Sequence, residues 1–171
     1  MTNQANLFTP AFSPEQLKRR EDVILKQATT FIAEMQTMTP GEIPHFLVYG
    51  ILDWSWCLRF VKSNEMYRGF RFYSKKALEE IRAGETKFRR DHIVPKKLVK
   101  EMLLGLDHPT ETSVRDILGR FGEVCVITLE EDAKLNAAGL NNEMPSDWTN
   151  DKDVFARYKS IGIEWTENKI S

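Results

Sequence analysis

The first part of the chain has the hydrophobic pattern of one long helix. Ser13, Pro14 and Gln16 are typical of a helix start, because serine caps free N–H groups, proline suits the first turn and glutamine completes a capping box. Apolar side chains then recur every three or four residues, at Ile24, Ala28, Phe31, Met35 and Met38. This spacing predicts a helix with one buried face, ended by the segment TMTPGEIP.

The segment from residue 43 to 62 is apolar and aromatic almost throughout. Its length approaches the roughly 20 residues of a membrane span, but Asp53 and Arg59 would be costly in hydrocarbon. We therefore expect a buried helix or helix pair and no membrane association. Beyond it, the run YRGFRFY fits a half-buried strand, although the same aromatic and basic residues could stack on unpaired bases. Ser74 and Gly84 then predict the cap and the end of a short helix.

After residue 85 the pattern changes to short strands alternating with helices. TKFRR predicts a strand that is followed by Asp91 and His92, and Pro95 suits the first turn of the next helix. The expected apolar faces of this helix and of the one after it are Leu98, Met102 and Leu106, then Val114, Ile117, Leu118 and Phe121. EVCVIT, rich in β-branched residues, predicts a second strand. Thr128 and Glu131 then form a capping-box pattern for another helix.

These elements predict an α+β fold that is mostly helical, with a small two-stranded ββα-like element in the C-terminal half. We expect residues 1–85 to form a helical N-terminal part, and residues 86–171 to form the strand and helix module with a C-terminal helix. A chain of 171 residues of which 42% are hydrophobic can bury a substantial core. Both parts are therefore expected to belong to one compact domain.

The charge of the chain is concentrated locally. A formal net charge of −1 and an isoelectric point near 6.3 exclude a uniformly basic nucleic-acid coat. Between residues 87 and 100, however, one acid accompanies six basic residues, namely Lys87, Arg89, Arg90, Lys96, Lys97 and Lys100. This group, called the basic segment below, could contact the phosphates of a nucleic acid, DNA being our expectation, or form the solvated side of a helix.

The cysteines and the N-terminus indicate the compartment. Cys57 and Cys125 lie in separate apolar runs without a second cysteine or histidine at zinc-ligand spacing, so both are expected to be small buried hydrophobic residues. The segment MTNQANLFTPAFSPEQ has no basic stretch followed by an apolar core, as a secretory signal would. We therefore expect a cytoplasmic protein.

Candidate chemistry gathers where the two strands and the capped helix should meet. If the strands pair and the helix packs on them, Asp91, His92 and Asp132 converge, and Asn136 lies one turn after Asp132. Carboxylate and amide oxygens suit Mg²⁺ or Mn²⁺, and an imidazole can accept a proton from water near neutral pH. The alternatives are that His92 only caps the next helix and that Asp132 only stabilises the helix dipole.

Two motifs carry a family resemblance. DHIVP and VITLEEDAKLN resemble the two halves of the HNH, or His-Me finger (ββα-metal), endonuclease motif, and the likeness covers residues 86 to 140. The resemblance implies that His92 is the general base and that Asp91 and Asp132 bind the metal ion. It also implies that residues 86–171 contain a His-Me finger-like module.

The leading expectation is therefore a metal-dependent nuclease that hydrolyses phosphodiester bonds in DNA. Two alternatives stay open at the level of the sequence. One is a non-enzymatic protein-interaction module, such as a defence or immunity factor, with a degenerate HNH-like fold. The other is a nucleic-acid-binding protein that uses the basic segment without cleavage.

Overall fold

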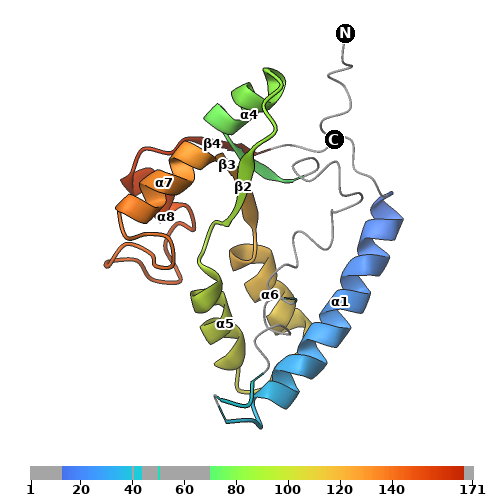
Figure 1. The fold of residues 1–171 in the computed structure, drawn as a ribbon. Coiled ribbons are helices and arrows are strands. Elements are labelled where there is room, and N and C mark those ends of the chain that lie inside the picture. The colour runs from blue at the N-terminus through green and yellow to red at the C-terminus, as the bar shows by residue number, and fades with distance from the viewer. Residues whose placement is uncertain (1–12, 40, 44–49, 51–69, 168–171) are drawn as a thin grey trace.

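The computed structural model describes residues 13–39, 41–43, 50 and 70–167, which form an α+β fold (Figure 1). The helices are α1 (Pro14–Met35), α4 (Lys75–Arg82), α5 (Lys96–Leu104), α6 (Glu111–Phe121), α7 (Leu129–Ala137) and α8 (Ala156–Ser160). The strands are β1 (Phe72–Ser74), β2 (Phe88–His92), β3 (Val124–Thr128) and β4 (Trp165–Glu167). The fold class predicted from the sequence is thus confirmed.

The apolar segment at 44–49 and 51–62, together with Cys57, lies outside the described residues. Its expected helix stays a prediction. In the parts of the chain that the structure describes, no helix combines the length and the apolar character needed to cross a bilayer.

The four strands form one mixed sheet in the order β2-β3-β1-β4. β2 runs antiparallel to β3, β1 runs parallel to β3, and β4 runs antiparallel to β1. The sheet is therefore larger than the expected two-stranded element, because β1 and β4 extend it. β1 comes from residues 1–85 and the other strands from residues 86–171, so both parts of the chain contribute to the same sheet.

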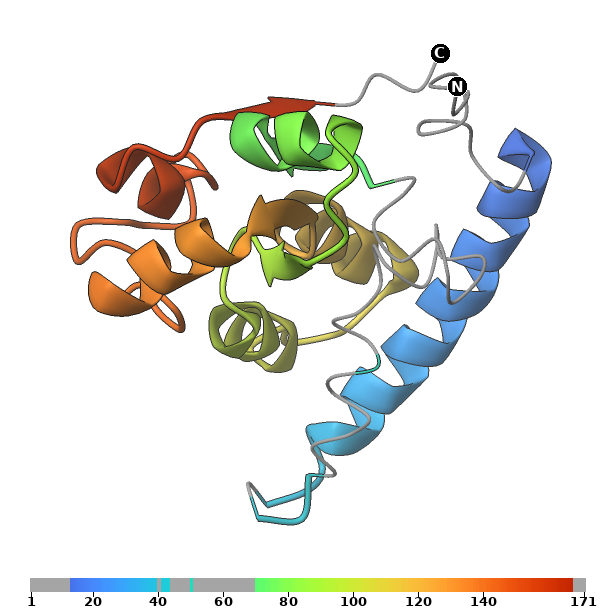
Figure 2. The ribbon, with the colours of Figure 1, turned by 45° about the horizontal axis from the view of Figure 1, so that its top comes forward.

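β3 lies inside the sheet, and all of its residues are buried. Because side chains alternate between the faces of a strand, Cys125 and Ile127 pack with residues of α7 and α8, whereas Val124 and Val126 pack with residues of α4. A third core is formed by α1, α5 and α6. Figure 2 shows α1 along one side of the molecule and α7 and α8 on the opposite side.

Local capping groups place three helices where the sequence predicts them. The side chains of Ser13, Ser74 and Thr128 accept backbone hydrogen bonds at the starts of α1, α4 and α7. Gly84 and Gly139 follow α4 and α7 with φ angles of 97° and 71°, in the left-handed region that glycine adopts at no steric cost.

The buried face of α5 differs from the expected one. Val99 and Leu103 are buried, whereas Leu98, Met102 and Leu106 are only partly buried at the edge of the same core. The helix packs against both α1 and α6, so its buried stripe is broader than a single row of residues. The sequence pattern identified the residues along one edge of this stripe and missed Val99 and Leu103 at its centre.

Candidate functional site

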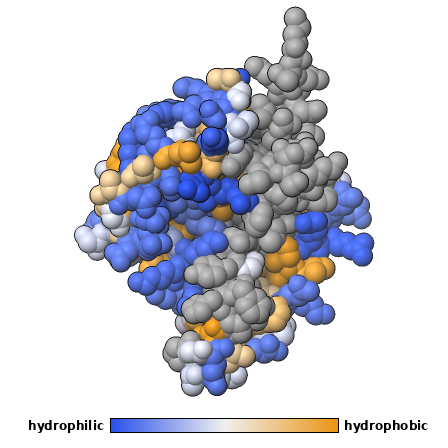
Figure 3. All heavy atoms as spheres, viewed as in Figure 1, coloured by the Kyte–Doolittle hydropathy of each residue, from blue (hydrophilic) through white to orange (hydrophobic). Residues whose placement is uncertain are grey.

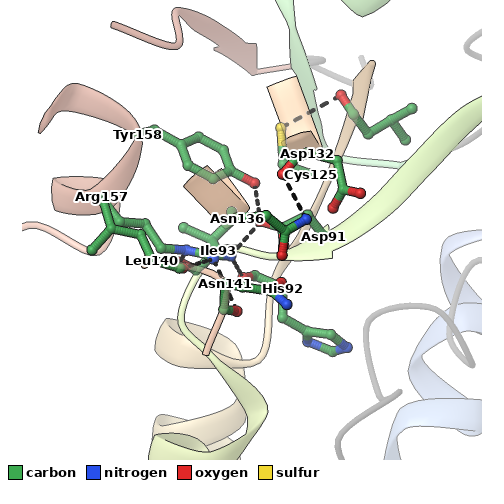
Figure 4. A network of polar contacts seen from close by, with 11 residues as sticks. Asp91, His92, Ile93, Cys125, Asp132, Asn136, Leu140, Asn141, Arg157 and Tyr158 are labelled. Carbon is green, nitrogen blue, oxygen red and sulfur yellow. Dashed lines mark hydrogen bonds and ion pairs between the residues drawn. The ribbon is translucent and has the colours of Figure 1, made fainter. Parts of the chain in front are cut away.

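Asp91 and His92 lie at the end of β2, where they pair in register with Cys125 and Val124 of β3. Consecutive side chains of a strand point to opposite faces of the sheet. Figure 4 shows the Asp91 carboxylate inside a polar network with residues of α8, whereas the His92 imidazole points away from this network. The two side chains are therefore neighbours in sequence without facing one another.

The Asp91 carboxylate is held by two consecutive residues of α8. Arg157 Nη2 donates to this carboxylate and to the carbonyl of His92, and the Tyr158 hydroxyl donates to Asp91 Oδ2 at 2.6 Å. Arg157 Nε donates to the Ile93 carbonyl at 2.8 Å. The side chains of Arg157 and Asp91 are 1% and 12% exposed. A buried guanidinium thus neutralises Asp91 and fixes the end of β2 to α8.

The Arg157 guanidinium also binds the loop that follows α7. Its Nη1 atom donates to the carbonyl of Leu140 at 2.8 Å and, more weakly, to that of Asn141 at 3.5 Å. Guanidinium offers five N–H donors in a rigid fork, so a single side chain can connect β2, this loop and α8. Arg157 was not predicted from the sequence, because the segment VFARYKS contains no local sign of partners 16 to 66 residues away.

Asp132 and Asn136 lie on α7, and their contacts are different from those expected. Asp132 Oδ2 is 3.4 Å from Nε of Arg89 on β2. The Asn136 amide donates to the backbone carbonyl of Asp132 at 2.9 Å, which is a contact within the helix. α7 therefore meets β2 through the Arg89–Asp132 ion pair.

Burial controls the protonation of two groups beside Asp91. Removal from water raises the pKa of the Cys125 thiol and of the Tyr158 hydroxyl well above their ordinary values, and the charge of Asp91 acts in the same direction. Both groups consequently stay protonated at neutral pH. Cys125 is fully buried, as predicted, and its thiol is not poised for nucleophilic chemistry.

The arrangement fits the divalent cation implied by the HNH resemblance poorly. Each expected carboxylate ligand already has an arginine partner, Arg157 for Asp91 and Arg89 for Asp132. Among the described residues, no group of three or more histidine, cysteine, aspartate or glutamate side chains is placed to hold a metal ion. A cation would have to compete with a guanidinium at both carboxylates.

The basic segment extends from the residue before β2 into the first half of α5. Its exposed members are Lys87, Arg89 and Lys97, and its half-buried members are Arg90, Lys96 and Lys100. Within the described part of the chain, the side chains of Lys87, Lys97 and Lys100 form no ion pair. α5 also begins without a side-chain cap, and its first-turn lysines oppose the helix dipole. Figure 3 shows a mostly hydrophilic surface over β2 and α5.

A buried carboxylate joins the starts of α4 and α7. Glu131 is 5% exposed, and its Oε2 atom accepts hydrogen bonds from the Ser74 hydroxyl at 2.6 Å and from the Thr128 N–H at 2.9 Å. Ser74 and Thr128 are themselves the N-caps of the two helices. The capping-box pattern predicted the contact with Thr128, whereas the contact with Ser74 depends on the sheet, which brings the ends of β1 and β3 together.

Comparisons with protein-family models, with curated protein sequences and with solved structures found no match. The resemblance to the HNH family therefore remains a prediction from two motifs.

Proposed function

We propose that the protein binds nucleic acid, DNA in the first instance, by placing the basic segment against the phosphate backbone. The charge balance of this segment carries the proposal. Its single acid, Asp91, is neutralised by buried Arg157, whereas Lys87, Lys97 and Lys100 have no ion-pair partner among the described residues. The segment is therefore positive at its surface although the chain has a formal charge of −1. Phosphate contacts of this kind are sensitive to salt and largely independent of base sequence.

This binding requires no metal ion and gives His92 no chemical role. DNA binding fits the observed partner of Asp91, since the buried Arg157 guanidinium neutralises a carboxylate charge that would otherwise repel phosphate. We place the activity in the cytoplasm, where a free thiol such as that of Cys125 stays reduced.

Removing Lys97 and Lys100 together tests the proposal. We expect the double variant Lys97→Gln/Lys100→Gln to bind a short fluorescent DNA duplex about a hundredfold more weakly at low salt, because it loses two charge-assisted hydrogen bonds to phosphate of about 1.5 kcal/mol each. Fluorescence anisotropy measures the Kd. The matched control is Lys18→Gln/Lys26→Gln, which removes two lysines from α1.

Equal weakening in both double variants would point to a general charge effect and contradict a local phosphate site. If the wild-type protein binds neither double-stranded nor single-stranded DNA nor RNA, the proposal is wrong. A protein-interaction module of the defence or immunity kind is then the better account.

A second candidate function is metal-dependent hydrolysis of phosphodiester bonds. It is favoured by the order of elements, since β2, β3 and α7 follow the strand, strand and helix order of a ββα unit and α7 packs on both strands. Asp91 and His92 then lie at the end of the first strand, with Asp132 and Asn136 on the helix. The arginine partners of Asp91 and Asp132 make it the weaker candidate.

A cleavage assay separates the two candidates. We expect plasmid and single-stranded DNA to stay intact with the wild-type protein in Mg²⁺ or Mn²⁺, because the Asp91 carboxylate is already neutralised by the buried Arg157 guanidinium. Gel electrophoresis of the products is the measurement. Cleavage that is abolished by EDTA and by His92→Ala, but retained by the control His108→Ala, would establish the hydrolase instead.

A further inference from the structure

The three acids in the first turn of α7 have separate surroundings. Glu130 is exposed and forms an ion pair with Lys76 of α4. Glu131 is buried beneath the helix start. Asp132 is the one that reaches the basic segment, through its contact with Arg89. The same turn of helix therefore supplies a carboxylate to the surface that we assign to phosphate.

The Arg89–Asp132 ion pair has the features of a contact that another anion can replace. It is a single contact of 3.4 Å between Arg89 Nε and Asp132 Oδ2, and the two side chains are 62% and 25% exposed. Within the described residues, the Arg89 guanidinium forms no hydrogen bond. Exposed pairs of this kind contribute little to stability, and salt screens them.

Asp132 is also more firmly placed than Arg89. The helix that carries it is fixed at its start by the Thr128 capping box, and acids in this turn are favoured by the helix dipole. Arg89 is a long, exposed side chain on the edge strand β2. The movement needed to exchange partners is therefore a change of the arginine rotamer alone.

We propose that in the free protein Asp132 forms an ion pair with Arg89 in the place that a phosphate would take. On binding, a backbone phosphate of the nucleic acid replaces the Asp132 carboxylate as the partner of Arg89. Carboxylate and phosphate oxygens bind guanidinium in the same way, and phosphate can use both parallel N–H groups. Asp132 thereby lowers the affinity of the basic segment for anions. This inference rests on the proposed function, because it names the residue that limits the same binding site.

A double-mutant cycle with a DNA duplex tests the exchange. Four proteins are compared by anisotropy at one low salt concentration: wild type, Asp132→Asn, Arg89→Gln and the double variant. We expect Asp132→Asn to tighten binding about threefold in the wild-type background and clearly less in the Arg89→Gln background, where only the general effect of removing a negative charge remains. Glu130→Gln is the control for removing a charge from the same turn, and we expect it to change the Kd equally in both backgrounds.

Each result is decisive. Tightening by Asp132→Asn that depends on Arg89 supports the exchange. Equal tightening in both backgrounds, or none in either, overturns it while leaving DNA binding by the basic segment intact. Absence of binding by the wild-type protein overturns the proposed function and this inference together. The substituted residues are all at exposed or half-exposed positions, and thermal unfolding verifies that each variant is folded.

Discussion

Replacing Arg157 with methionine is expected to lower the free energy of unfolding by about 3–5 kcal/mol, since removing one partner of a buried ion pair leaves the other charge uncompensated. The change removes the partner of Asp91 and the donors to the carbonyls of His92, Ile93 and Leu140. Methionine fills part of the space, so the loss comes mainly from unpaired polar groups. Urea unfolding followed by circular dichroism measures it.

The control is Lys159→Met in the same helix. Its side chain is 60% exposed and its ion pair with Asp153 lies at the surface, so we expect a change within about 1 kcal/mol. A loss below about 1 kcal/mol for Arg157→Met would mean that Asp91 does not depend on this guanidinium.

The second large effect is expected at Glu131. We expect Glu131→Ala to reduce the free energy of unfolding by about 2–4 kcal/mol, because a buried donor left without its acceptor costs about 1–3 kcal/mol and a lost helix cap about 1 kcal/mol. The donors concerned are the Ser74 hydroxyl and the Thr128 N–H. Thermal and urea unfolding give the value.

Glu130→Ala is the matched control, because Glu130 precedes Glu131 in the same helix and its ion pairs with Lys76 and Lys134 are exposed. It should change the free energy of unfolding by no more than about 1 kcal/mol. If both glutamates proved equally important, the buried link between α4 and α7 would not be a main support of the fold.

The helix starts could be predicted because their signals are local in the sequence. Ser13 with Gln16 and Thr128 with Glu131 lie three residues apart, so the capping box is visible without any knowledge of tertiary structure. β4 was not predicted. Its three residues pair with β1, and the ring of Trp165 stacks on the ring of Phe155 with 4.1 Å between the ring centroids. Contacts of this kind join distant segments and leave no periodic pattern.

The candidate site likewise combines residues that the sequence identifies with contacts that the sequence does not reveal. The order of Asp91, His92 and Asp132 along a strand, a second strand and a helix could be read from the sequence. Their actual partners could not, because Arg157 approaches Asp91 from α8, 66 residues away. Arg89 was expected to bind phosphate, and the structure shows it beside Asp132. The sequence thus identified the strand or helix on which each candidate residue lies. The arginines that pair with the two carboxylates depend on the complete fold.

The salt dependence of DNA binding is the decisive measurement for the proposed function. The Kd of the wild-type protein and of Lys97→Gln/Lys100→Gln should be measured over about 50 to 200 mM salt, a range in which binding to phosphate weakens strongly. We predict a steep dependence for the wild type, and a slope of log Kd against log salt that is shallower by about two units for the variant, one for each phosphate that it no longer binds. Equal slopes for the two proteins would show that α5 does not contact phosphate and would contradict the proposed function.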